Sequence, residues 1–109
     1  MKQHAIVIAD TDGVIQLWSE GAAKLFGFSP DEAVGQKLDL VVPAQFRDHH
    51  WKGFRQAMKV GSRAGEDQFF DAPALCRTGE TKTLRGQLHV LRSESNGAIG
   101  AMAIFTSPA

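Results

Sequence analysis

Residues 41–60, VVPAQFRDHHWKGFRQAMKV, contain the side chain best suited to chemistry, His50. Helical periodicity places His50 on a face that is otherwise apolar, and that face is formed by Phe46, Phe54 and Ala57. An imidazole directed at a core is either bonded to a neighbouring group or a ligand for a molecule held in that core. The function of this chain depends on which of these two roles His50 has.

His49 adjoins His50, and together with Asp48 the pair superficially suggests a metal site. Neighbours on a helix point about 100° apart, so the two imidazoles do not readily bind one metal ion. We therefore expect His49 to be solvated or at the rim of a pocket. His89 lies on the polar side of an alternating strand pattern and is expected to be exposed.

Composition and motifs exclude several other functions. The formal net charge is +0, which disfavours nucleic acid and anionic membranes as partners. No apolar run is long enough for a signal peptide core or a membrane span, so we expect a cytoplasmic domain without membrane contact. The single cysteine, Cys76, cannot form an internal disulfide and is expected to be a buried structural residue. No catalytic triad, carboxylate pair or phosphate-binding glycine loop is present, so we expect no enzymatic activity.

The N-terminal half is expected to form a β-hairpin followed by short helices. Residues 4–9 (HAIVIA) are apolar and β-branched, a tight turn follows at Asp-Gly, and residues 14–18 form the returning strand. Ser19 is suited to capping a helix that Gly27 ends. Ser29, with proline next to it, begins a second short helix. The helix that carries His50 follows a turn at a proline and is expected to end near residue 61.

The C-terminal half is expected to contain three strands. After the polar and flexible stretch 62–67 (SRAGED), residues 68–77 form a strand, a turn follows at residues 78–80, and residues 81–92 alternate between apolar and polar side chains. Residues 98–106 form the closing strand. Two strands, several helices and three further strands in 109 residues predict one α+β domain over residues 1–109.

Three stretches of this chain resemble the PAS domain, the sensory-box family. They are VIADTDGVIQLWSEGAAKLFGFSPDEAVGQKL, VVPAQFRDHHWKGF, and CRTGET within the expected hairpin. The resemblance spans nearly the whole chain. It implies a five-stranded antiparallel sheet with short helices and one longer helix packed on one face. It also implies a pocket for a cofactor or small ligand, or a role in dimerisation.

The resemblance also separates three classes of cofactor. Flavin-adduct photosensors carry a cysteine in an Asn-Cys-Arg helix motif, whereas Cys76 lies in LCRTGE beside a hairpin, so no flavin adduct is expected. Coumaroyl photoreceptors need tyrosine partners, and this chain has no tyrosine. Heme-binding PAS sensors place their proximal histidine seven residues after a proline, and Pro43 plus seven is His50. The resemblance thus implies heme b with His50 as the proximal ligand of its iron, and Arg47 matches an arginine of the same motif.

The heme resemblance further assigns residues around the cofactor. Ungapped counting places the distal gas-contacting position of the heme sensors on Phe70 or Gln68, and a propionate-binding arginine on Gln56. The remaining expected contacts with the cofactor are apolar: Phe46, Phe54, Leu88 and Met102.

Two functions follow from the resemblance. The first is a sensor of a diatomic gas or of redox state through heme on His50, acting on a separate or downstream signalling protein. The second is a heme-free PAS module for dimerisation, protein interaction or small-metabolite binding. A homodimer is expected in either case. The closing strand ends in IFTS, without the aspartate of the usual Asp-Ile-Thr relay sequence.

Overall fold

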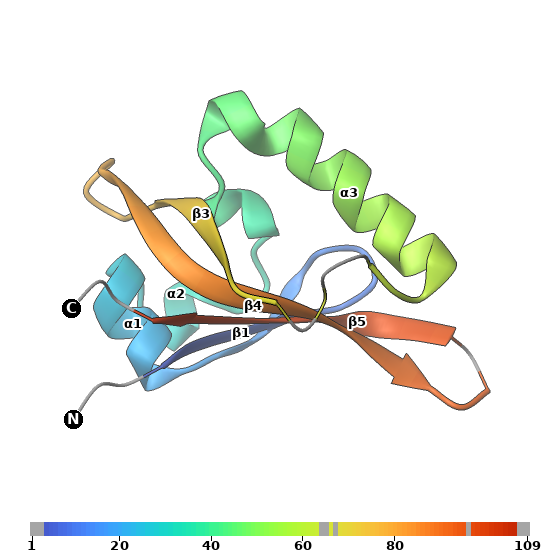
Figure 1. The fold of residues 1–109 in the computed structure, drawn as a ribbon. Coiled ribbons are helices and arrows are strands. Elements are labelled where there is room, and N and C mark those ends of the chain that lie inside the picture. Colours follow the sequence, from blue (N-terminus) through green and yellow to red (C-terminus); the bar gives the residue numbers. More distant parts are fainter. Residues whose placement is uncertain (1–3, 64–65, 67, 96, 107–109) are drawn as a thin grey trace.

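Five strands form one antiparallel sheet in the computed structural model, which describes residues 4–63, 66, 68–95 and 97–106 (Figure 1). The strand order is β2-β1-β5-β4-β3, so the two chain halves meet where β1 pairs with β5. The strands are β1 Ala5–Ala9, β2 Ile15–Trp18, β3 Phe70–Leu75, β4 Thr81–Ser93 and β5 Gly97–Thr106. The helices are α1 Glu20–Phe26, α2 Pro30–Ala33 and α3 Arg47–Val60, with 3-10 turns η1 Leu38–Val41 and η2 Ala44–Phe46. The predicted α+β architecture, a five-stranded antiparallel sheet with short helices and one longer helix, is confirmed.

Local capping determines where the short helices begin and end. The Ser19 hydroxyl accepts the backbone N–H of Ala22 at the start of α1, and Gly27 ends that helix with a φ of 89°. Ser29 and Glu32 form a reciprocal capping box at α2. The predicted positions of both caps are confirmed.

The core lies between the inner face of the sheet and the helices α1 and α2. Phe26 of α1 is fully buried and meets the ring of Phe105 edge-on at 5.9 Å. Trp18 packs on Phe26 at 5.3 Å, and its indole N–H donates to the carbonyl of Phe28 at 2.8 Å. Cys76 is buried beside this core, as predicted. The core therefore fills one end of the sheet.

The helix α3 lies across the sheet, apart from α1 and α2 (Figure 1). Among its residues only Ala57 is buried, although its sequence has an apolar face. A helix that covers a sheet face through a single buried alanine leaves room beneath it. That room is the candidate functional site described below.

The indole of Trp51 packs against the β1–β2 turn of its own chain. Gly13 lies in this turn with a φ of 79°, and a β-carbon at this position would overlap the six-membered ring of Trp51. The indole N–H also donates to the Asp39 carboxylate at 2.6 Å. The ring of Trp51 therefore lies between the turn and η1.

The contact between Gly13 and Trp51 leads to a prediction about stability. Gly13→Ala and Gly35→Ala both place alanine at a positive φ, which costs about 1–2 kcal/mol, but only Gly35 has open space around its missing β-carbon. We expect Gly13→Ala to destabilise the domain by about 1–3 kcal/mol more than Gly35→Ala because the indole must move. Urea denaturation of both variants measures the difference, and equal losses would contradict the packing described here.

Candidate functional site

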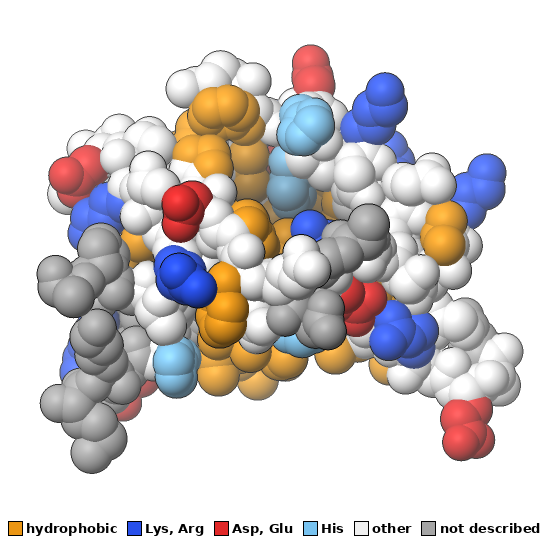
Figure 2. All heavy atoms as spheres, viewed as in Figure 1, with side chains coloured by type: hydrophobic (Ala, Val, Ile, Leu, Met, Phe, Trp, Pro, Cys, Tyr) orange, Lys and Arg blue, Asp and Glu red, His pale blue; other side chains and the backbone are white. Residues whose placement is uncertain are grey.

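A cavity of about 680 Å³ lies between α3 and the inner face of the sheet. Its wall comes from α3, η1 and η2 on one side and from β1, β3, β4 and β5 on the other. Figure 2 shows hydrophobic side chains gathered in the hollow below α3, with histidine side chains beside it. A largely apolar cavity of this size, with a few polar groups on its wall, is typical of a small-molecule site.

His50 lies on the α3 wall of this cavity and is half-buried. Its ring stacks on Phe54 with a centroid distance of 6.0 Å and meets the edge of Trp51 at 4.9 Å. Its Nδ1 atom is buried and has no hydrogen-bond partner among the residues that the structure describes. A buried polar atom without a partner costs free energy, so no hydrogen bond to Nδ1 from the described residues holds this ring in place.

Burial lowers the pKa of His50 from its ordinary value. Partial removal from water disfavours the imidazolium form, and the nearby His49 lowers the pKa further, while the Asp39 carboxylate opposes both. His50 is therefore neutral at physiological pH, with a nitrogen lone pair available to an electrophile or a metal.

The depressed pKa of His50 predicts that acid destabilises the domain. The unfolded chain titrates near 6.5 and the folded chain lower, so below 6.5 the unfolded state binds more protons. The contribution of His50 to stability is fully present above 6.5 and is lost as the pH falls through its folded pKa. We expect the free energy of unfolding to fall from neutral pH to about pH 5, above the range of ordinary carboxylates.

Urea denaturation at several pH values tests this expectation. His50→Gln should flatten the pH dependence in this window, whereas the matched variant His49→Gln, which removes only the smallest cause of the His50 shift, should keep most of the wild-type slope. A slope unchanged by His50→Gln would mean that another group carries the dependence.

Four of the predicted cofactor contacts line the cavity, and one of them lies at its edge. Phe54, Phe70 and Leu88 contribute to the wall, and Phe46 does so with 41% of its surface exposed. His49 is exposed at the rim, as predicted. The structure therefore brings His50 together with its expected apolar neighbours from both the helix and the strands.

Two predicted cofactor contacts do not belong to the cavity wall. Gln68 is exposed, precedes β3 and does not line the cavity, because the strand begins only at Phe70. Met102 lies on the outer face of the sheet, since its neighbours Ala101 and Ala103 on β5 point into the cavity and side chains alternate along a strand. Gln56, expected at a propionate position, is also exposed and outside the wall. His89, expected to be exposed, is half-buried.

The sequence did not identify Arg63 as a site residue, although its guanidinium belongs to the cavity wall. Arg63 donates to the Leu88 carbonyl at 3.4 Å, and its guanidinium lies 5.7 Å from the centre of the Phe70 ring. It follows the end of α3 in a polar stretch, where an arginine ordinarily faces water. The available signal was its place just after Gly61, where the chain turns back to the sheet.

The model of the PAS fold family matches residues 3–106. This chain belongs to the PAS family. The match covers almost the whole domain, and it agrees with the strand order and with the helix-covered inner face of the sheet. A PAS domain is a sensory module, so the cavity is the natural place to look for its signal.

The sensor protein FixL of Bradyrhizobium diazoefficiens is a sequence relative of this PAS domain. The two are 41% identical over 46 residues, which are 42% of this chain and 9% of that protein. The match therefore spans a small fraction of the relative's length, and the activity of the whole relative is not carried over by it.

Solved PAS structures share the fold at low sequence identity. The PAS domain of a protein from Colwellia psychrerythraea has a TM-score of 0.78 at 22% identity, with 94% of this chain and 83% of that chain covered. The PAS domain of the quorum-sensing receptor RpfR from Cronobacter turicensis, in complex with C12:0, has a TM-score of 0.75 at 17% identity, with 97% and 94% covered. The LOV protein of Rhodobacter sphaeroides has a TM-score of 0.72 at 12% identity, covering 93% and 57%.

The described residues contain neither a cluster of metal ligands nor a helix able to cross a membrane. No three His, Cys, Asp or Glu side chains lie close enough together to hold a metal ion. Within the same residues, every helix is too short or too polar to cross a membrane.

Proposed function

We propose that this PAS domain is a sensor that binds heme b in the cavity, with His50 as the axial ligand. The observation that carries the proposal is the position of His50: a half-buried imidazole, with a pKa that burial lowers, on the wall of an apolar cavity. Heme requires such an imidazole and a cavity that excludes water. His50 and the apolar wall of the cavity are therefore chemically suited to hold heme.

The residues of the chain have separate parts in this proposal. His50 would hold the iron from the α3 wall, and burial favours its neutral ring, which has one nitrogen free to act as a ligand. Leu88 and Phe70 form an apolar wall on the strand side, which excludes water. Arg63 supplies a cation for a carboxylate at the cavity wall. Bound heme would supply an iron that takes a diatomic gas or changes redox state.

The position of Cys76 agrees with a site that uses no flavin adduct. Its Sγ atom is buried and lies 3.8 Å from the Leu25 carbonyl, and the residue is not part of the cavity wall. Burial also raises the pKa of this thiol, which makes it a poor nucleophile.

Arg63 favours a second candidate, a medium-chain fatty acid in a heme-free cavity. An apolar wall with one guanidinium suits an alkyl chain that carries a carboxylate, and RpfR, a structural relative, was solved in complex with C12:0. In this alternative His50 packs beside the alkyl chain and is not a ligand for iron.

Titration with hemin and with dodecanoic acid separates the two candidates. Under the heme proposal hemin binds at one per chain and develops a Soret band, and dodecanoate competes with it weakly. Arg63→Met is then expected to weaken the binding of hemin by no more than about tenfold, because only one charge-assisted hydrogen bond is lost. Dodecanoate binding that Arg63→Met weakens, in a chain that takes up no hemin, would favour the second candidate. Arg85→Met is the matched control, because Arg85 lies outside the cavity wall over Phe69.

A further inference from the structure

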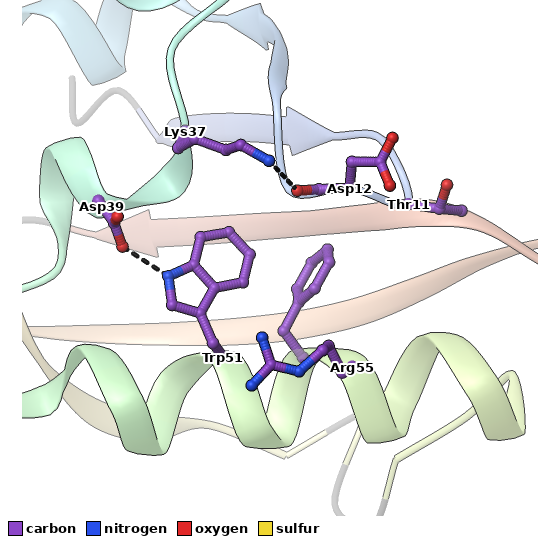
Figure 3. A pocket seen from close by; sticks show the side chains of 7 residues that line it. Thr11, Asp12, Lys37, Asp39, Trp51 and Arg55 are labelled. Carbon is purple, nitrogen blue, oxygen red and sulfur yellow. Dashed lines mark hydrogen bonds between the residues drawn. The ribbon is translucent and has the colours of Figure 1, made fainter.

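A second, smaller pocket of about 350 Å³ has Trp51 and Phe54, the aromatic neighbours of His50, in its wall (Figure 3). Phe54 lines both this outer pocket and the cavity. Trp51 lines the outer pocket and contacts the imidazole of His50 with its ring at 4.9 Å. Trp51 and Phe54 also meet each other edge-on at 5.4 Å. These two rings therefore link His50 to the outer pocket.

The imidazole of His50 is held by contacts with aromatic rings and not by a hydrogen bond to Nδ1 from the described residues. In a ligating histidine, the N–H of the second ring nitrogen ordinarily donates a hydrogen bond to a carbonyl or carboxylate, which fixes the orientation of the ring. The Nδ1 atom of His50 has no such partner in the described part of the chain. The ring contacts that the structure does provide come from Trp51 and Phe54.

Trp51 itself is held from three directions. Its indole N–H donates to the Asp39 carboxylate at 2.6 Å, and Figure 3 shows the ring directed from α3 toward η1 and the β1–β2 turn. Gly13 packs against its six-membered ring. The Lys37 ammonium lies 5.9 Å from the ring centroid. The indole therefore has little freedom to turn.

The backbone around Asp39 is held in turn by the side chain of Arg47. The Arg47 guanidinium donates to the Asp39 carbonyl at 3.4 Å and to the Val42 carbonyl at 3.1 Å, which ties the first turn of α3 to η1. The Asp39 carboxylate also acts on the His50 imidazole through space. Asp39 can thus influence His50 in two ways, by holding the indole and by its charge.

We propose that Trp51 is a positioning residue for His50, and that Asp39 acts through it by accepting the indole N–H. The edge contact of the indole takes the place of the missing hydrogen bond to Nδ1 and keeps the other imidazole nitrogen available to the cavity. The part of this inference that concerns heme rests on the proposed function, whereas the orientation of the imidazole does not.

Four variants separate geometry from charge. Asp39→Asn keeps an oxygen for the indole N–H and removes the charge, whereas Asp39→Ala removes both. Trp51→Phe keeps a ring without the N–H, and Trp51→Leu removes the ring. Asp48→Asn and Phe69→Leu are the matched controls, because Asp48 is exposed on the same helix and Phe69 is an exposed aromatic residue outside both pockets.

The first readout is the imidazole nitrogen NMR signal of His50 in the protein without added ligand, assigned with His50→Gln. We expect Trp51→Leu and Asp39→Ala to change its nitrogen shifts and tautomer balance, and Asp39→Asn to keep the tautomer while lowering the titration midpoint. The second readout is hemin affinity. It should fall about tenfold in Trp51→Leu and Asp39→Ala, the usual effect of losing a group that orients a metal ligand, and less than threefold in Asp39→Asn.

The His50 NMR signals and the hemin affinity can give different results, and this separates the positioning role from the heme proposal. Unchanged His50 signals and hemin affinity within threefold of wild type in both Trp51→Leu and Asp39→Ala would overturn the positioning role. A chain that binds no hemin but whose His50 signals shift in these variants would support the positioning role and overturn the heme proposal. If Trp51→Leu does not fold, Trp51→Phe and the Asp39 pair decide the question alone.

Discussion

His50→Ala is expected to lower the affinity of the domain for hemin by at least about a hundredfold. Loss of a group that only orients a metal ligand costs up to about a hundredfold, and loss of the ligand itself should cost at least as much. The variant removes the neutral imidazole on the cavity wall and leaves the apolar surfaces of Phe54 and Leu88 in place. Residual binding to those surfaces would be weak and would lack the spectrum of an imidazole-ligated iron. Titration followed by absorption and by fluorescence measures both effects.

His49→Ala is the matched control for this prediction. It removes the same side chain one residue earlier, from an exposed position at the rim of the cavity. We expect its hemin affinity to stay within about threefold of wild type, because a rim residue makes at most a solvent-screened contact. Equal losses in the two variants would show that neither histidine is the axial ligand.

Ala103→Phe is expected to lower the affinity of the cavity for any ligand, whether heme or fatty acid, by at least about tenfold. Ala103 faces the cavity from β5, between its cross-strand neighbours Val7 and Leu88. A phenyl ring there occupies volume that a ligand needs. Because Ala103 also packs against the hydrophobic core, we expect the larger ring to destabilise the domain by about 1–3 kcal/mol as well.

Met102→Phe provides the control, since Met102 is adjacent in β5 but lies on the outer face of the sheet. This variant should bind ligand like the wild type. Loss of binding in Met102→Phe with normal binding in Ala103→Phe would mean that the ligand lies on the outer face and that the cavity is not the site.

The local elements of this PAS domain could be predicted because short-range chemistry determines them. Ser19 and Ser29 cap helices through bonds to residues three positions away, and Gly27 ends α1 by adopting a positive φ. The position of His50 on the helix face followed from periodicity alone. Its neighbours Phe46 and Phe54 were found for the same reason.

The errors arose where the sequence pattern does not distinguish two faces or where spacing was counted without gaps. β5 carries small or apolar residues on both sides, so alternation could not show that Met102 points away from the cavity. Gln68 was placed by ungapped counting, but β3 begins at Phe70. Trp51 and Gly13 are 38 positions apart, and no local rule predicts that they touch. Such contacts depend on tertiary packing.

The most direct test of the heme proposal is the absorption spectrum of the wild-type domain expressed with a supply of heme. We predict a Soret band with one heme per chain, which shifts when carbon monoxide or nitric oxide is added to the reduced protein. A domain that shows no band after purification and takes up no hemin on titration would contradict the account.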